Sequence, residues 1–278
     1  MSVFDEPKID CHVHVFDPSR FPYRDDTPYR PTGQEVGTTA QLIAMLDAYG
    51  VRQALYVQPN SGYFIDNACM LDALAHHPGR LKGTAVVAHD TDAAALQRLK
   101  EAGVIGVAIN TPMFGTEAYR DLSPLAARLR SLEMLLEIQV QNDDLLALLP
   151  VIEATGVRVL VDHCGRPAPE RGIDQPGFRA LLDLGRTGRA VVKLGGEATF
   201  SRLPFPHEDA WPYQRALLHA FTPDLCVWGS NWPFLRATER IDYGPLLVRL
   251  AALLPDAADR RKVLWETPRR VFGFHGER

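Results

Sequence analysis

The sequence contains few cysteines, and they are scattered along the chain. Cys11, Cys69, Cys164 and Cys226 are the only four among 278 residues, and no two of them form a Cys-x-x-Cys pair. Three of the four lie inside or directly after apolar runs. We therefore expect free, buried thiols in a cytoplasmic protein rather than disulfides.

The chain also lacks an excess of charge of either sign and any long apolar run. Thirty Lys and Arg residues oppose 34 Asp and Glu residues, which gives a net charge of −4 without a basic stripe. This pattern argues against a nucleic-acid partner and against attachment to an anionic membrane. No apolar run is long enough to span a bilayer, and residues 1–8 lack the basic and apolar segments of a signal peptide.

The chain does contain a regular alternation of short apolar, β-branched runs with helical patterns. Residues 39–50 show helical spacing that ends at Gly50, and similar patterns end at Gly103 and Gly156. Eight such units predict an α/β fold, a closed (β/α)₈ TIM barrel. Because no linker rich in Pro, Gly or Ser divides the chain, residues 1–278 are expected to form one domain. The expected strands are 9–15, 53–57, 83–88, 103–109, 135–140, 157–162, 190–194 and 226–229.

Several long segments without periodicity follow the expected strands. In a parallel barrel such connections build the C-terminal face, where these enzymes place their active sites. The turns that precede the strands are short, and this asymmetry favours a functional C-terminal face. The long segments are 17–37, 59–65, 110–119, 164–176 and 195–211.

Three histidines and one asparagine fall at the ends of expected strands. His12 and His14 are two residues apart on the first strand, so both side chains point the same way. His163 closes the sixth strand, and Asn231 follows the eighth. If the barrel forms, these four residues converge on one pocket, where imidazoles can hold a metal or polarise a substrate oxygen.

These positions carry a resemblance to the amidohydrolase superfamily, over about residues 9–272. Within it, the chain looks most like 2-pyrone-4,6-dicarboxylate lactonase and related sugar-lactone and muconolactone hydrolases. The resemblance lies in His12-x-His14, Asp162-His163-x-Gly165-Arg166-Pro167, Gly229-x-x-Trp232-Pro233, Gln58 and the Asp66-Asn67 pair.

The resemblance implies a carboxylic ester hydrolase that opens a small lactone in carbohydrate or aromatic catabolism. In the family, a carboxylate after the eighth strand takes a proton from water, and histidines, a metal or both polarise the ester carbonyl. Here that position is Asn231, whose amide cannot accept a proton near neutral pH.

Three interpretations of Asn231 stay open. The protein is a hydrolase with another base, a base-deficient variant that binds and barely turns over, or a lactone isomerase or decarboxylase on the same scaffold. Among other bases, Glu197 is the leading candidate, and His163 can serve if no metal is bound. Glu137 and Asp10 are expected to lie deeper in the barrel.

The resemblance also bears on cofactors. The lactonase group works without a metal, so no obligatory metal is expected. The alternative is one divalent ion such as Zn²⁺, held by His12, His14 and His163.

The expected ligand is a small lactone or carboxylate. Arg166 is expected to clamp a carboxylate, because a guanidinium matches it with two parallel hydrogen bonds. Ala108 stands where a further clamp arginine is expected, so the ligand should carry fewer negative charges than a dicarboxylate. The sequence leaves open whether the chain forms a homo-oligomer. The other expected substrate-binding residues are Tyr29, Asn60, Ser61 and Lys193.

Overall fold

The computed structural model describes residues 2–275 of the chain, and within them eight parallel strands form one sheet in chain order. Each strand is hydrogen-bonded to the next along the chain. The strands are β1 (Lys8–Val13), β2 (Val51–Val57), β3 (Leu81–Ala85), β4 (Val104–Asn110), β5 (Leu135–Gln139), β6 (Val159–Val161), β7 (Ala190–Lys193) and β8 (Cys226–Val227).

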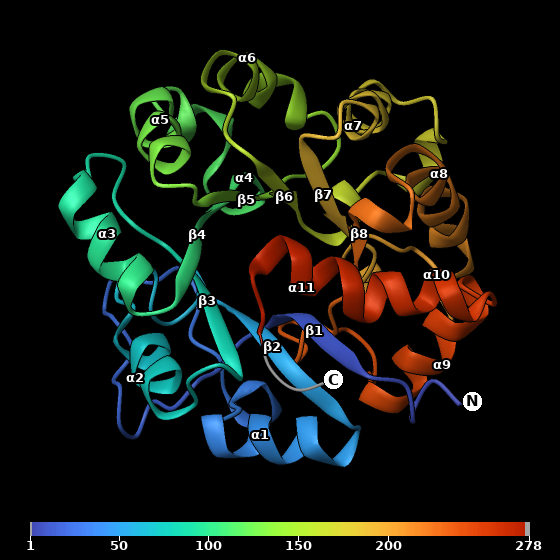
Figure 1. Cartoon of the computed structure of the whole chain (residues 1–278), viewed down its shortest axis with the longest axis horizontal. Coiled ribbons are helices and arrows are strands. Elements are labelled where there is room, and N and C mark those ends of the chain that lie inside the picture. The colour runs from blue at the N-terminus through green and yellow to red at the C-terminus, as the bar shows by residue number, and fades with distance from the viewer. Residues whose placement is uncertain (1, 276–278) are drawn as a thin grey trace.

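The sheet closes into a barrel between its first and last strands (Figure 1). The amide of Cys11 donates to the carbonyl of Trp228 at 2.9 Å, and the amide of His14 donates to the carbonyl of Trp232 at 2.8 Å. The predicted (β/α)₈ barrel is therefore confirmed. The predicted strand ends are less accurate: β3 lies about two residues earlier than expected, and β6 and β8 are shorter.

Helices cover the outside of the barrel, and the main apolar core lies between them and the strands. Their ends follow local rules: Thr38 and Gln41 form a capping box before α1, and Gly156 ends α6 in the left-handed conformation. The helices are α1 (Thr39–Ala48), α2 (Ala68–His76), α3 (Ala93–Glu101), α4 (Thr111–Phe114), α5 (Ser123–Ser131), α6 (Leu145–Thr155), α7 (Pro176–Arg186), α8 (Trp211–Phe221), α9 (Tyr243–Leu253), α10 (Ala257–Arg261) and α11 (Thr267–Phe272).

A second apolar cluster fills one end of the barrel interior. Ile9, Leu160 and Val227 from the strands pack with Trp265 and Phe272 from the C-terminal segment. Figure 1 shows α11 lying across this end of the barrel. That end is closed by apolar packing, so the opposite end is left for a polar site.

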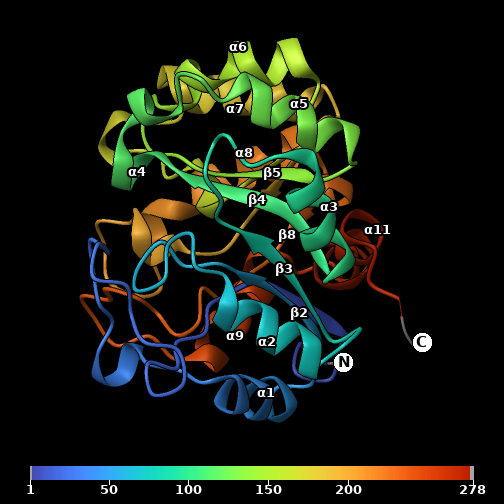
Figure 2. The same ribbon diagram turned by 90° about the vertical axis from the view of Figure 1, so that its left-hand side faces the viewer.

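The long connections gather at that opposite end (Figure 2). The loops after β1, β2 and β8 lie on the left of this view, away from α11 and the C-terminus. This is the predicted C-terminal face. Cys11, Cys69, Cys164 and Cys226 are free and buried, as predicted. Among the described residues, no helix is long and apolar enough to cross a membrane.

Candidate active site

The site begins with the two histidines of the first strand. Nε2 of His12 lies 3.2 Å from Nε2 of His14, and Nδ1 of His14 lies 2.8 Å from the carbonyl oxygen of Val57. A carbonyl oxygen only accepts, so His14 Nδ1 carries a hydrogen and Nε2 of the neutral ring is an acceptor. His12 therefore donates from Nε2 to His14, which leaves Nδ1 of His12 as an acceptor.

Lys193, at the end of β7, supplies the matching donor from below. Its Nζ atom is fully buried and lies 3.0 Å from Nδ1 of His12. An ammonium group only donates, so the contact agrees with the tautomer assigned to His12. One continuous hydrogen-bond chain therefore runs from Lys193 through His12 and His14 to the carbonyl of Val57. It fixes the hydrogen of His12 on Nε2 and that of His14 on Nδ1.

Two carboxyl groups surround the same ammonium. Lys193 makes a short contact with Glu137 of β5, and its Nζ lies 3.0 Å from Oδ1 of Asp162. The second approach lacks hydrogen-bond geometry: within the described part of the chain, Asp162 Oδ1 and Glu137 Oε2 have no hydrogen-bond partner. We therefore treat Lys193 and Asp162 as an ion pair without a hydrogen bond.

Burial keeps the three imidazoles neutral. Burial, helped by the Lys193 charge, lowers the pKa of His12 to about 3, and burial lowers the pKa of His14 to about 4. Burial and the nearby His12 hold the pKa of His163 well below its usual range. Near pH 7 all three rings are therefore neutral.

The two carboxyl groups differ in charge. Burial and the neighbouring Asp162 raise the pKa of Glu137 to about 8, so Glu137 is protonated at neutral pH. Burial by itself raises the pKa of Asp162, but Lys193 and His12 outweigh it and hold that pKa well below its usual range. Asp162 thus carries the charge that balances Lys193.

His163 faces the same space from the end of β6. Its ring centroid lies 4.5 Å from that of His12. A Cβ atom at Gly196 would lie 2.0 Å from Nδ1 of His163, so only glycine leaves room for the ring there, and its φ of +79° suits glycine as well. Within residues 2–275 the ring nitrogens of His163 form no hydrogen bond, so they are available to a ligand.

Arg166 and Asn231 add polar groups to the same wall. Arg166 donates to the carbonyl of Thr199 at 3.2 Å, but its Nε has no partner and no ion pair involves it within the described chain. The backbone amide of Asn231 donates to the carbonyl of His12 at 2.9 Å, which places the side chain beside β1. His163, Arg166 and Asn231 have φ values of 48°, 44° and 64°. Such strained backbone is concentrated at functional sites.

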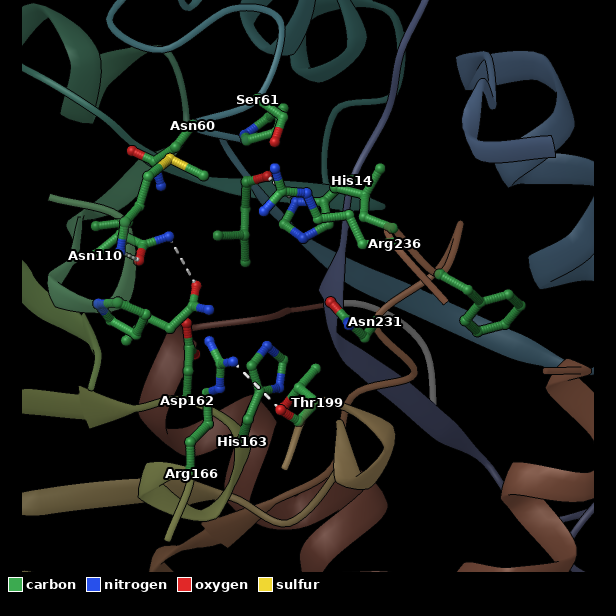
Figure 3. A pocket seen from close by; sticks show the side chains of 18 of the residues that line it. His14, Asn60, Ser61, Asn110, Asp162, His163, Arg166, Thr199, Asn231 and Arg236 are labelled. Atoms are coloured by element: carbon green, nitrogen blue, oxygen red, sulfur yellow. Dashed lines mark hydrogen bonds between the residues drawn. The ribbon is translucent and has the colours of Figure 1, made fainter. Parts of the chain in front are cut away.

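These side chains line one cavity of about 610 Å³ at the C-terminal end of the barrel. Figure 3 shows His14 and Asn231 on one side of it and Asp162, His163 and Arg166 on another. The cavity is mixed in character, with amides beside aliphatic groups. Other polar residues that line it are Gln58, Asn60, Ser61, Asn110, Gln139, Gln141, Thr199, Arg236 and Thr238.

A model of the Amidohydrolase family matches residues 9–274, which is nearly the whole chain. The chain belongs to the amidohydrolase family. It is 31% identical over 274 residues to 4-sulfomuconolactone hydrolase from Rhizobium radiobacter, covering 95% of this chain and 89% of that one. It is 26% identical over 273 residues to D-galactarolactone isomerase from Agrobacterium fabrum, covering 97% and 92%.

A solved structure agrees with this assignment. The crystal structure of a probable 2-pyrone-4,6-dicarboxylic acid hydrolase from Acinetobacter baumannii, with citric acid bound, has a TM-score of 0.88 and 28% sequence identity. The match covers 96% of this chain and 99% of that chain. The predicted amidohydrolase and lactonase resemblance is confirmed.

The structure of this amidohydrolase brings most of the predicted site residues together. His14, His163, Asn231 and Arg166 line the cavity, as do Asn60 and Ser61. His12 lies directly beneath, 1% exposed, and contacts His14 rather than the open cavity.

Two predicted substrate-binding residues lie elsewhere. Lys193 is 0% exposed and contacts His12, Glu137 and Asp162, so it cannot reach a ligand in the cavity. Tyr29 does not line the cavity, because its hydroxyl donates to Glu35 instead.

Glu197 does not serve as the missing base. Its side chain is buried, pairs with Arg249 and accepts from Gln214 at 2.8 Å, away from the cavity. Asp10 is equally occupied: it accepts from the amides of His12 and Ser230 and from the Tyr243 hydroxyl. Both carboxylates therefore hold loops and helices in place.

Sequence reasoning missed two charged cavity residues of this amidohydrolase. Asp162 was part of the strand-six motif, but its position in the cavity wall depends on the 3₁₀ turn that follows β6. Arg236 lies in an irregular segment after β8, where no periodicity reports the direction of a side chain.

The donors in this amidohydrolase do not fit a resident divalent metal. The grouped ligand atoms are those of His12, Asp162 and His163, within 4.8 Å of one another, rather than the predicted set with His14. Lys193 Nζ lies 3.0 Å from both His12 Nδ1 and Asp162 Oδ1, so a buried ammonium already contacts two of these donor groups. In addition, the tautomer assigned to His12 places a hydrogen on Nε2, and that nitrogen would have to lose it to ligate a metal.

Proposed function

We propose that this amidohydrolase opens the cyclic ester of a small lactone that carries a carboxylate, with water as the nucleophile, and that it needs no metal or other cofactor. The observation that carries the proposal is the pairing of His163, whose ring nitrogens are free, with Arg166, whose guanidinium has no carboxylate partner, in one cavity wall. One group moves a proton, and the other anchors an anion. The similarity to a sulfomuconolactone hydrolase supports the same reaction class.

Each residue has a distinct role in this reaction. Arg166 binds the substrate carboxylate, and the amide of Asn231 donates to the ester carbonyl oxygen. The water oxygen attacks the carbonyl carbon while His163 takes its proton, and Asp162 stabilises the imidazolium that forms. The tetrahedral oxyanion then expels the ring oxygen, and His163 returns the proton to it. The product is an open-chain acid.

His14 and His12 shape the site and do not transfer protons in this reaction. Their tautomers are fixed by the chain that begins at Lys193, so His14 presents a neutral, unreactive edge to the carbonyl. The four free cysteines agree with a reducing compartment such as the cytoplasm, and we infer that the chain works there as one domain.

A second candidate reaction, lactone isomerisation, is favoured by Asn231. In isomerisation a hydroxyl of the substrate itself attacks the carbonyl, so no carboxylate is needed to activate water. The similarity to D-galactarolactone isomerase supports this alternative. Both reactions use the same anion anchor and the same proton acceptor.

Turnover in ¹⁸O-labelled water separates the two reactions. The enzyme, dialysed against a chelator, is mixed with a panel of carboxylate-bearing lactones, including sulfomuconolactone and sugar-acid lactones. Hydrolysis places one ¹⁸O in the new carboxylate and releases a proton, whereas isomerisation does neither. If no lactone in the panel is hydrolysed or isomerised by either wild type or Asn231→Asp, the proposed function is wrong.

The Asn231→Asp variant tests the proposed hydrolysis further. A carboxylate at this position adds a general base, which is worth about 10²- to 10⁴-fold in rate. A gain in ester hydrolysis supports the hydrolase, while the loss of an existing isomerisation supports the isomerase. Asn231→Ala is the matched control, because it removes the amide without adding a base.

A further inference from the structure

Arg236 approaches the cavity from the loop that follows β8. It lines the cavity together with Asn231 and Phe234 of the same loop. Figure 3 places it near His14 and Asn231, on the side opposite Arg166. The two arginines therefore face the cavity from different loops.

The backbone that carries Arg236 is tied down by a second loop. The amide of Arg236 donates to Oε1 of Glu35 at 2.5 Å, and the Tyr29 hydroxyl donates to the other carboxylate oxygen of Glu35. The guanidinium of Arg236 lies 4.4 Å from the centre of the Tyr29 ring. Glu35 thus joins the loop after β1 to the loop after β8, and Tyr29 supports the guanidinium from below.

Arg236 has no carboxylate partner in residues 2–275, although it is charged and close to acidic side chains in sequence. Its neighbour Arg240 does: it donates to both oxygens of Asp242, at 2.7 and 3.2 Å. Arg236 is exposed, and an unpaired arginine on an open surface is ordinary. An unpaired arginine on the wall of a reaction cavity leaves a fork of donors for a ligand anion.

The charge balance of the cavity agrees with this. Its wall holds three charged residues, Asp162, Arg166 and Arg236. Asp162 is balanced by Lys193 behind the wall. Within the described residues neither Arg166 nor Arg236 forms an ion pair, although Asp144 and Asp162 lie near enough to act on the charge of Arg166. The cavity thus holds two arginines without an ion-pair partner, although Ala108 stands where the resemblance implied a further clamp arginine.

We propose that Arg236 is a specificity-determining residue that binds an anionic substituent of the substrate, and that Glu35 is its positioning residue. The inference rests on the proposed function for the identity of the substrate, but its test does not require turnover. The ligand then carries two anionic groups, one for Arg166 and one for Arg236. The proposal therefore differs from the expectation of a less charged ligand that followed from Ala108.

Binding of two matched probes tests the proposal. Benzene-1,3-dicarboxylate and its monomethyl ester have the same ring and differ by one charge, and titration calorimetry gives the Kd of each. Wild type is expected to bind the dianion at least about tenfold more tightly, the size of one charge-assisted hydrogen bond. Arg236→Met should remove this preference and leave the Kd of the monoester within about twofold, and Arg236→Lys should restore part of it.

The role of Glu35 needs its own variants. Glu35→Ala should weaken dianion binding with little effect on the monoester, while Glu35→Gln should rescue it, because its amide oxygen still accepts from the backbone of Arg236. Arg240→Met is the matched control and should change neither Kd. The unfolding midpoint of each variant shows that the fold is intact.

Two results would overturn the proposal. One is a wild type that binds the dianion no more tightly than the monoester, including failure to bind either at millimolar concentration. The other is an Arg236→Met variant that weakens both probes equally or neither. A protein that shows the predicted preference but turns over no lactone would refute the proposed function and leave the anion site standing.

Discussion

Two buried ionic clusters flank β7, and they differ in how completely their polar atoms are paired. Arg249 donates to Glu197, to Gln214 at 2.9 Å and to the carbonyls of Pro206 and His207 at 2.6 and 3.3 Å. Gln214 in turn donates to Glu197 at 2.8 Å and to the carbonyl of Leu194 at 2.5 Å. Each guanidinium nitrogen of Arg249 and both polar atoms of the Gln214 side chain therefore have a partner.

The cluster around Lys193 is left incomplete. Asp162 Oδ1 and Glu137 Oε2 have no hydrogen-bond partner in the described chain, and the cluster ends on three neutral imidazoles beside a cavity. A buried polar group without a partner is costly, so its persistence calls for an explanation. We infer from this difference that the paired cluster around Arg249 stabilises the fold, whereas the incompletely paired cluster around Lys193 serves the proposed reaction.

His163→Gln should have the largest effect on activity, because it removes the group that carries the proton. Loss of a general base costs about 10²- to 10⁴-fold in kcat. Steady-state kinetics on the lactone turned over in the ¹⁸O experiment measures it. A variant that keeps activity within tenfold would show that another group, with Asp162 the first choice, accepts the proton.

Lys193→Met should lower kcat about 100-fold in the folded protein and shift its pH dependence. The ammonium holds the tautomers of His12 and His14, and it adds to the burial and the nearby His12 that lower the pKa of His163. Without it, the acid limb of kcat/KM should move up toward pH 6.5, which a merely structural loss would not cause. An unchanged pH profile would contradict a positioning role.

Arg249→Met is the matched substitution in the other cluster, because it also removes the buried cation. It leaves Glu197 buried without its cation, which costs about 3–5 kcal/mol of the free energy of unfolding. Urea unfolding measures this loss. Because the cluster is outside the cavity, kcat of the folded protein should stay within twofold of wild type, and a large fall in kcat would remove the distinction between the clusters.

The pH dependence of kcat/KM in the wild-type protein is the smallest of the expected effects, and it requires no substitution. A histidine with its ordinary pKa loses activity as pH falls through about 6.5. Since the pKa of His163 lies well below that value, its neutral form persists at lower pH. We expect kcat/KM to stay level from pH 7 down through pH 6 and to fall only at more acidic pH. An acid limb centred near pH 6.5 would contradict the buried, neutral state.

The sequence predicted the barrel and the convergence of His14, His163 and Asn231 for one reason. Parallel strands end on the same face, so residues at their C-terminal ends must meet there. Residues beyond those ends were harder to place. Glu197 was misjudged because its partner Arg249 lies 52 residues away, and no local pattern reports such a contact.

Lys193 shows a second limit. It ends β7 in the sequence, yet it lies at the same level of the barrel as Glu137 and beneath the cavity floor. The level that a side chain occupies depends on the stagger between strands, which is a property of the closed sheet. Arg236 was missed because its backbone amide is held by Glu35, which is 201 residues away in the sequence.

The most direct test of the account is the tautomer of each active-site imidazole, read from two-bond ¹⁵N–¹H correlations of histidine-labelled protein near pH 7. The account predicts three neutral rings, with the hydrogen of His12 on Nε2 and that of His14 on Nδ1, and a chelator should leave the spectrum unchanged. A hydrogen on Nδ1 of His12, or an imidazolium at either position, would contradict the chain that starts at Lys193 and the metal-free chemistry built on it.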